Sequence, residues 1–234
     1  MSGKFFSNNH YDSSSIFEFK DLSASTKEVL SKVYSNLALL SVSCALGIIG
    51  NMFLGIGGKL TGFASLMCFL LFIGAGQKSP WRFPLLSLFV FLDGVSIGPL
   101  ISLALEVDPS ILIQALFATF GIFISFSYTA LKSDKRHFLY LGGILGMSTL
   151  FILVCSILGM LGLASNFMFN IQLYVGLLVF CGYVIYDTQV MILQIEMGNK
   201  DDLAHAMNLF IDLLGVFVRI LIILLKNAKD KKKD

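Results

Sequence analysis

Two aspartates interrupt the apolar C-terminal third of this 234-residue chain, and they are the residues best placed to do chemistry. Asp187 lies near the end of one apolar segment and Asp212 near the start of the next, with a short polar loop at 196–202 between them. If the two segments form an antiparallel helical hairpin, a rise of about 1.5 Å per residue places the aspartates roughly 7 and 10 Å below the same membrane face. We therefore expect their carboxyl groups to meet.

A carboxylate inside a bilayer is costly, at about 2.5–3.5 kcal/mol for an aspartate at the centre of a spanning helix. Two carboxylates within a few ångströms of each other cannot both ionise cheaply, so the pair should exchange protons as a unit. Such a pair can share a proton, hold a cation or perform acid–base chemistry. The alternative is two independent polar residues that face a water-filled vestibule. Because intramembrane acids commonly mark functional sites, we predict a functional aspartate pair.

Other ionisable side chains also lie within or beside the apolar segments, and three of them bear on the aspartate pair. Asp93 lies in the middle of one, and it either lines the same pathway or forms a hydrogen bond to a neighbouring helix. Arg219 follows Asp212 by seven residues, which is two helical turns and about 10 Å on the same face. It either neutralises a carboxylate or extends towards the far interface, and the distance favours the second. His205, at the mouth of the hairpin, either adds a titration near neutral pH or begins a helix at the interface.

The composition excludes an ordinary soluble domain. Hydrophobic residues make up 56% of the chain and charged residues 14%, with a mean hydropathy of +0.82, whereas soluble chains carry about 25% charged residues. The four cysteines all lie in apolar segments, without the spacing of a zinc site or a disulfide framework, which indicates a packing role. Motifs for phosphate binding, zinc-dependent or serine hydrolysis and nucleic-acid binding are missing. We therefore expect an integral membrane protein with no enzymatic activity, no cofactor and no nucleic-acid partner.

Seven apolar stretches are candidates for crossing a bilayer, and the second is the shortest. They lie at 34–54, 60–76, 83–105, 110–131, 138–163, 169–192 and 205–225. Because the linkers are too short to hold a separate domain, the sequence predicts one all-α bundle of seven transmembrane helices over 34–225. Residues 1–33 form an N-terminal tail in which 23–32 can make a short amphipathic helix, and 226–234 form a lysine-rich C-terminal tail.

Lysine and arginine in the connecting loops indicate the orientation. In a seven-span arrangement one face receives ten of these residues, including Lys78 and Arg82, and the loops of the other face receive only Lys59. The N-terminus is therefore predicted to be cytosolic. The lysine-rich tail then falls on the opposite side, unless the last segment is re-entrant and returns to the cytosol. The tail ends in Lys231-Lys232-Lys233-Asp234. These lysines either match a cytosolic dilysine signal for retrieval to the endoplasmic reticulum or bind anionic lipid.

Glycines recur at a spacing of four residues in several of the apolar segments. The pairs are Gly58 with Gly62, Gly94 with Gly98, and Gly142 with Gly146. Without a side chain, such pairs allow helix backbones to approach closely in lipid. We interpret them as packing positions within the bundle rather than as a dimerisation motif.

Several stretches between residues 93 and 234 resemble the Bax inhibitor-1 family, also called the transmembrane Bax inhibitor motif family. They are Gly94-Val95-Ser96-Ile97-Gly98-Pro99, Asp108-Pro109-Ser110-Ile111-Leu112, Tyr140-Leu141-Gly142-Gly143-Ile144-Leu145, Tyr174-Val175-Gly176-Leu177, Asp187-Thr188-Gln189, Leu209-Phe210-Ile211-Asp212 and the lysine-rich end. These stretches are in register with the family, including the interval between the two aspartates. The N-terminal third agrees in hydropathy only.

The resemblance implies a seven-helix protein of the endoplasmic-reticulum membrane that suppresses apoptosis and is a pH-sensitive calcium leak channel. Asp187 and Asp212 correspond to the family's paired carboxylates, which would sense protons and hold Ca²⁺ transiently. Calcium is then the permeant ion and the proton the regulator. Bacterial relatives place an arginine near the second helix to latch the pair, and the nearest candidates here are Lys78 and Arg82. Asp93 departs from the residue usual before the Gly-x-x-x-Gly-Pro turn.

Two other functions stay open at this point. One is a membrane scaffold that binds cell-death regulators, such as the Bcl-2 family, with the aspartates only stabilising the bundle. The other is an intramembrane aspartyl protease, which places one aspartate after a tyrosine on a sixth span, as in Tyr186-Asp187. The second aspartate of such enzymes lies in Gly-x-Gly-Asp, whereas Ile211 precedes Asp212 here, and their Pro-Ala-Leu segment is missing.

Overall fold

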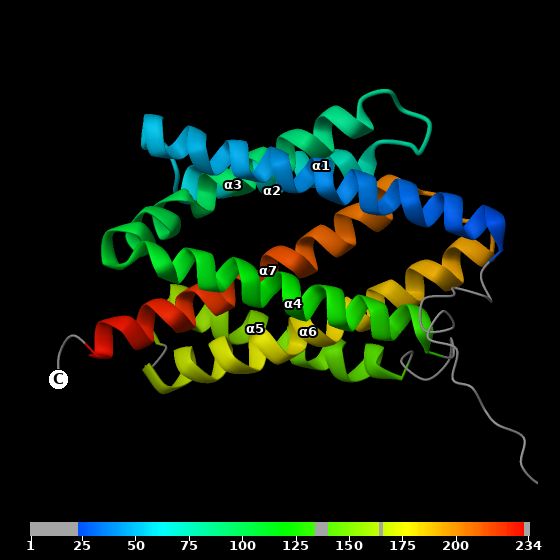
Figure 1. Cartoon of the computed structure of the whole chain (residues 1–234). Helices are drawn as coiled ribbons and strands as arrows, with labels where there is room; N and C mark the ends of the chain where they lie inside the picture. The colour runs from blue at the N-terminus through cyan, green and yellow to red at the C-terminus, as the bar shows by residue number, and fades with distance from the viewer. Residues whose placement is uncertain (1–22, 134–139, 164–165, 232–234) are drawn as a thin grey trace, which may run out of the picture.

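The computed structural model describes residues 23–133, 140–163 and 166–231, and within these ranges all regular secondary structure is helical (Figure 1). The helices are α1 (Ala24–Leu54), α2 (Lys59–Gly74), α3 (Arg82–Val107), α4 (Pro109–Lys132), α5 (Leu141–Met160), α6 (Asn166–Glu196) and α7 (Asp202–Lys231). Successive helices run in alternating directions, so α1 begins and α7 ends at opposite ends of the bundle. The α2–α3 and α6–α7 connections lie at the end where α1 begins.

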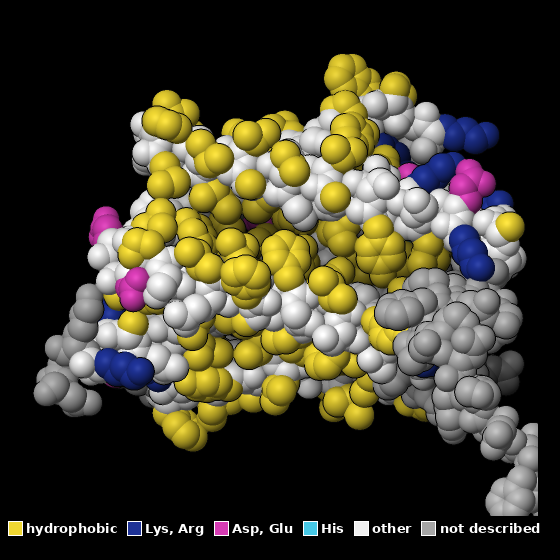
Figure 2. All heavy atoms as spheres, viewed as in Figure 1, with side chains coloured by type: hydrophobic (Ala, Val, Ile, Leu, Met, Phe, Trp, Pro, Cys, Tyr) yellow, Lys and Arg dark blue, Asp and Glu magenta, His cyan; other side chains and the backbone are white. Residues whose placement is uncertain are grey.

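Six of the helices are long and apolar enough to cross a bilayer, which confirms the prediction of an all-α membrane protein. The exception is α2, whose 16 residues span about 24 Å against a hydrocarbon core of about 30 Å. The count of seven spans therefore stays a prediction. Lys, Arg, Asp and Glu gather at the two ends of the molecule, with hydrophobic side chains between them (Figure 2). The last helix, α7, has 30 residues without a break, a length suited to crossing rather than re-entry.

The N-terminal boundary differs from the predicted one. The first helix begins at Ala24 and takes up the segment that was expected to form a separate amphipathic helix. Ser23 caps it, since its hydroxyl accepts a hydrogen bond from the backbone N–H of Thr26 at 3.1 Å. Such a cap satisfies an N–H group that has no partner within the first helical turn. The rest of the predicted tail, residues 1–22, lies outside the described residues.

The last helix is the centre of the bundle. It packs against α1, α3, α4 and α6, and in Figure 1 it crosses diagonally between the α1–α3 group and the α4–α6 group. Its fully or nearly buried side chains include Leu209, Val216 and Leu221, none of which is more than 1% exposed. Any movement of this helix must therefore change contacts on both sides of the bundle.

Close packing of α1 on α3 depends on glycine, as predicted for Gly94 and Gly98. A Cβ atom at Gly94 would overlap the carbonyl oxygen of Cys44, and one at Gly98 would overlap the side chain of Asn51. Gly142 of α5 likewise lies against the ring of Tyr186, at 2.8 Å from a Cβ built there. The packing interpretation is wrong for Gly146, because a Cβ there meets no atom within 4 Å.

We expect Gly94→Ala to lower the thermal stability of the detergent-purified protein. The added methyl group meets backbone atoms of α1, which cannot rotate away, and such overpacking costs about 1–3 kcal/mol. This corresponds to a melting temperature lower by about 2–12 °C for a chain of this size. Gly146→Ala is the matched control, and a thermal melt should show it unchanged. Equal melting temperatures for wild type and Gly94→Ala would contradict the close approach of α1 to α3.

Candidate functional site

The α6–α7 hairpin brings Asp187 and Asp212 together, and we call these two residues the aspartate pair. Their carboxyl groups lie within hydrogen-bonding reach of each other, as the depth of the two residues in the sequence predicts. Asp212 is only 3% exposed, whereas Asp187 is half-buried. The Oδ2 atom of Asp212 is buried and accepts no hydrogen bond from a donor group in the described residues. A proton shared with Asp187 would satisfy it, because one carboxylic acid then donates to the other carboxylate.

The two helices that carry the pair are fitted closely to each other. Gly215 of α7 leaves the space that the ring of Phe180 fills, and Gly176 of α6 leaves space for the guanidinium of Arg219. α6 is also fastened to α4, because the buried Nε2 of Gln189 donates to the backbone oxygen of Ala130 at 3.0 Å. The aspartate pair thus links the central helix α7 to α6, which is itself anchored to α4.

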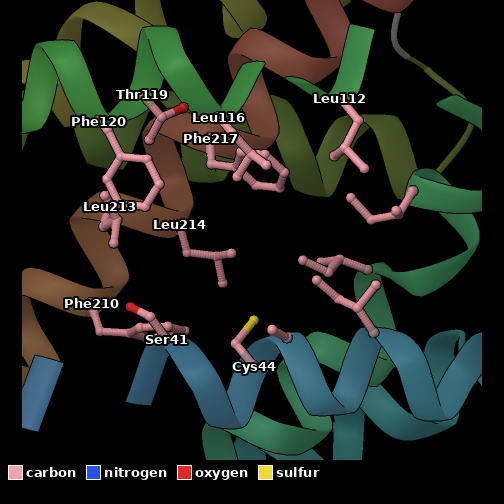
Figure 3. Close-up of a pocket in the computed structure, with 14 residues that line it drawn as sticks. Ser41, Cys44, Leu112, Leu116, Thr119, Phe120, Phe210, Leu213, Leu214 and Phe217 are labelled. Atoms are coloured by element: carbon pink, nitrogen blue, oxygen red, sulfur yellow. The ribbon is translucent and has the colours of Figure 1, made fainter. Parts of the chain in front are cut away.

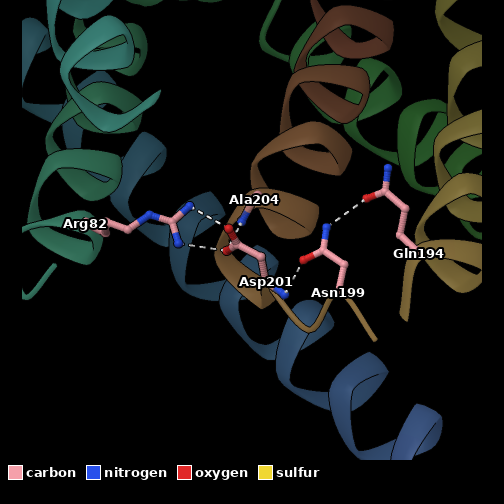
Figure 4. A network of polar contacts seen from close by, with 5 residues as sticks. All are labelled: Arg82, Gln194, Asn199, Asp201 and Ala204. Carbon is pink, nitrogen blue, oxygen red and sulfur yellow. Dashed lines mark hydrogen bonds and ion pairs between the residues drawn. The ribbon is translucent and has the colours of Figure 1, made fainter. Parts of the chain in front are cut away.

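A second polar cluster lies where the α6–α7 loop meets α3 (Figure 4). Arg82 donates from Nη1 to Oδ1 of Asp201 at 2.9 Å and from Nη2 to Oδ2 at 2.8 Å. Only 9% of the Arg82 side chain and 7% of the Asp201 side chain are exposed. The Arg82 guanidinium also lies 4.8 Å from the centre of the Phe72 ring, and Asp201 Oδ1 accepts a bond from the N–H of Ala204 at the start of α7. This is the bidentate geometry that makes arginine–carboxylate pairs strong.

The next residue of the same loop holds a different helix. Asp202 accepts a hydrogen bond from the side-chain amide of Asn36 in α1 at 2.8 Å. Together Arg82, Asp201, Asn36 and Asp202 fasten the α6–α7 loop to α3 and α1, and we call them the loop clamp. The sequence prediction did not single out Asp201, Asp202 or Asn36. Two adjacent acids in a short loop, on the face with the excess of Lys and Arg, were the available signal.

Two other predicted residues lie near the loop clamp without reaching the aspartate pair. His205 is buried in the first turn of α7, where its imidazole bonds to the backbone of Asn199. Its backbone N–H donates to the carbonyl oxygen of Asp201, so it helps to fix the loop. Lys78 is exposed in the α2–α3 connection. Among the residues that the structure describes, no Lys or Arg forms an ion pair with either carboxyl group of the pair.

Arg219 and Asp93 both have bonding partners other than the aspartate pair. The Arg219 guanidinium does not extend to the far interface but turns back, donating from Nη1 to the Gly215 carbonyl oxygen at 3.0 Å. It stacks 4.1 Å from the centre of the Phe180 ring, a cation–π contact that partly replaces a counter-ion. Asp93 accepts a hydrogen bond from the hydroxyl of Ser65 in α2 at 3.4 Å, which is the helix-bonding alternative.

Comparison with known proteins identifies the family. The family described as "Inhibitor of apoptosis-promoting Bax1" matches residues 26–229, from the first turn of α1 to the last turn of α7. This chain belongs to that family, the Bax inhibitor 1 family. Bax inhibitor 1 of Arabidopsis thaliana is 42% identical over 228 residues, which cover 95% of this chain and 90% of that protein. The proteins of that name from Rattus norvegicus and Homo sapiens are each 38% identical over 224 residues, covering 94% of both chains.

Neither candidate for the basic latch that the family resemblance implied contacts the aspartate pair. The Bax inhibitor 1 resemblance implied a basic residue that latches the aspartate pair, with Arg82 and Lys78 as the nearest choices. Here Arg82 pairs with Asp201 in the loop instead, and Lys78 is exposed. The reason is position, because Arg82 is the first residue of α3 and lies level with the loop rather than with the buried pair.

The aspartate pair supplies two carboxyl groups and no third ligand. Within the described ranges no group of three or more His, Cys, Asp or Glu side chains could hold a metal ion. Calcium takes six to eight oxygen ligands in a tight site. The two carboxyl groups of this member of the Bax inhibitor 1 family are oxygen donors of the kind that a hard cation prefers.

Proposed function

We propose that this protein is a pH-sensitive calcium leak channel of the endoplasmic-reticulum membrane that suppresses apoptosis. One observation carries the proposal: a buried carboxyl pair joins the central helix α7 to α6, and no Lys or Arg among the described residues neutralises it. Buried acids of this kind in a membrane bundle occur at ion and proton pathways. The family's description adds the connection to cell death.

The proposed gate is the contact between α6 and α7. With one proton between them, Asp187 and Asp212 hold the two helices together through a carboxylic acid–carboxylate hydrogen bond. Loss of that proton leaves two negative charges that repel each other and attract calcium, a hard cation that prefers oxygen ligands. Protons and Ca²⁺ therefore compete for the same oxygens, so the affinity of the pair for Ca²⁺ rises as the pH rises. No cofactor takes part in this mechanism.

The loop clamp gives this gate a fixed end. Because Arg82 and Asn36 hold the α6–α7 loop against α3 and α1, the two helices cannot separate at the loop while the clamp is closed. Changes in the charge of the aspartate pair then act on a hairpin whose loop end is held in place. An equilibrium between two such states shifts tenfold for each 1.4 kcal/mol or so of bias.

The orientation that supports this function has a cytosolic N-terminus, as the excess of Lys and Arg in the loops of one face indicates. Since α1 begins and α7 ends at opposite ends of the bundle, seven crossings would then place the lysine-rich tail in the lumen. A dilysine retrieval signal needs a cytosolic tail, so this orientation favours the alternative of binding to anionic lipid. Residence in the endoplasmic reticulum then rests on the family resemblance.

A second function is favoured by the description of the family as an inhibitor of apoptosis-promoting Bax1, which names inhibition of another protein rather than transport. In that case the protein is a membrane scaffold that binds cell-death regulators, among which the Bcl-2 family is the class to test, and the aspartate pair stabilises the bundle. The two functions differ in what the isolated protein does, because only a channel conducts ions without a partner.

Calcium flux into proteoliposomes that hold only this protein separates the two. With an indicator dye inside the vesicles, we expect influx that depends on the protein and varies from acidic to mildly alkaline pH. Vesicles without protein and vesicles loaded with a large fluorescent dye control for damaged membranes. Absence of flux at every pH, from folded protein, would overturn the channel and favour the scaffold.

A further inference from the structure

A groove opens in the side of the bundle, on the face of α7 turned away from the aspartate pair. It encloses about 300 Å³, at the lower end of the range of small-molecule sites. Side chains of α1, α3 and α4 form its walls and those of α7 its floor, and they point into one space in Figure 3. From α7 these are Phe210, Leu213, Leu214 and Phe217. At about 100° per residue, Asp212 lies on the opposite side of the helix.

The lining of this side groove offers almost no polar group to a ligand. Its two hydroxyls are both committed to their own helices, since Ser41 donates to the Leu37 carbonyl oxygen at 2.9 Å and Thr119 to that of Ala115 at 2.7 Å. Cys44 behaves as a small apolar side chain. An ion, a water cluster or a polar molecule would lose hydrogen bonds on entering and regain none. The occupant must therefore be hydrocarbon.

The mouth of the side groove faces the bilayer. The backbones of α1 and α4 do not come into contact over the described residues, so α7 is reached between them. The rims are exposed and apolar on both sides: Ala45 of α1 is exposed, and Leu116 and Phe120 of α4 are 40% and 48% exposed. Figure 2 shows hydrophobic side chains around the hollow between these two helices. In a membrane, acyl chains surround these rims.

We propose that the side groove binds one acyl chain of a bilayer phospholipid, which enters sideways between α1 and α4 and lies against α7. A straight hydrocarbon chain has the required shape and chemistry. A helix of a second copy is a poorer match, because with its side chains it is about 10–12 Å across and the groove encloses only about 300 Å³. This site is separate from the proposed ion pathway and does not depend on it.

Photolabelling tests this directly. The protein is reconstituted with phosphatidylcholine that carries a diazirine in the middle of one acyl chain, irradiated, and digested for mass spectrometry. Leu213 and Leu214 line the floor of the side groove and are half-buried, so an acyl chain in the groove reaches α7 at these residues. We expect label on 210–217 of α7 as well as on the outer faces of α1 and α5. Label confined to the outer faces would overturn the proposal.

Variants that fill the groove with a larger side chain provide a second test, with a matched control outside the groove. Ala45 lines the mouth, so Ala45→Phe should reduce labelling of 210–217 severalfold while leaving the outer faces labelled. Ala38→Phe places the same ring on the same face of α1 two turns earlier, outside the groove, and should leave the pattern unchanged. Leu116→Trp, on the α4 side, repeats the test if Ala45→Phe does not fold. Equal labelling of 210–217 in both filled variants and wild type would contradict an acyl-chain site.

Discussion

Replacing either Asp187 or Asp212 with asparagine is expected to remove the pH dependence of calcium flux. An amide occupies nearly the same space as a carboxyl group but cannot ionise, so each variant keeps the contact and cannot reach the state with two negative charges whose repulsion opens the proposed gate. Two unit charges about 4 Å apart interact by about 4 kcal/mol at an effective dielectric constant of 20. Wild-type flux should therefore change at least about tenfold across the titration, measured in proteoliposomes, and each variant should give a flat profile.

Asp93→Asn is the matched control for this experiment. It removes another carboxyl group within a spanning helix, but one that bonds to Ser65 of α2 rather than to the pair. It should keep the wild-type pH profile. Retention of the full pH response in both Asp187→Asn and Asp212→Asn would show that the pair does not sense protons. The concentration of Ca²⁺ that half-saturates flux should fall as the pH rises in wild type, because deprotonation frees the ligand oxygens.

Breaking the loop clamp should have the largest effect on stability. In Arg82→Met the Asp201 carboxylate stays buried without its partner, and removal of one member of a buried ion pair costs about 3–5 kcal/mol. For a chain of this size the melting temperature should fall by roughly 6–20 °C. Since the hairpin is then free at its loop end, we also expect higher basal calcium flux. A thermal melt and the proteoliposome assay measure the two effects.

A neutral double variant distinguishes the contact from the individual residues. Arg82→Gln with Asp201→Asn keeps a hydrogen-bonding pair and the cap on Ala204, so it should recover much of the stability lost in either single variant. The coupling between neighbours of this kind is about 0.5–3 kcal/mol. Lys78→Ala, which removes an exposed charge from the α2–α3 connection, should have the melting temperature of the wild type. Strictly additive single and double variants would mean that Arg82 and Asp201 do not act as a clamp.

The helical bundle and the meeting of the two aspartates could be predicted because they depend on short-range rules. Hydrophobic length fixes which segments cross a membrane, and a short loop forces two consecutive helices to lie antiparallel. The depth of Asp187 and Asp212 then follows from counting residues. The sequence predicted a helix over 23–32 but not its unbroken continuation into the first span, because the first turns of α1 are polar and the hydropathy rises only later.

Contacts between helices far apart in the chain could not be predicted in this way. Asp201 meets Arg82 across 119 residues and Asp202 meets Asn36 across 166, and nothing in the local sequence ties these positions together. Arg219 likewise turned to Phe180 on α6 because a glycine on that helix makes room for it. Gly146 has a favourable spacing for packing but faces open space, since spacing does not say which side of a helix meets a neighbour.

By itself the sequence determined that this is a membrane bundle with two acids at matching depth on adjacent helices, because hydropathy and helical rise act along the chain. Only the tertiary structure decided that α7 lies at the centre, that its loop is clamped to α1 and α3, and that an apolar groove opens on its other face. Those features arise from how helix surfaces fit together in three dimensions, and a periodic pattern along one helix does not contain the shape of its neighbours.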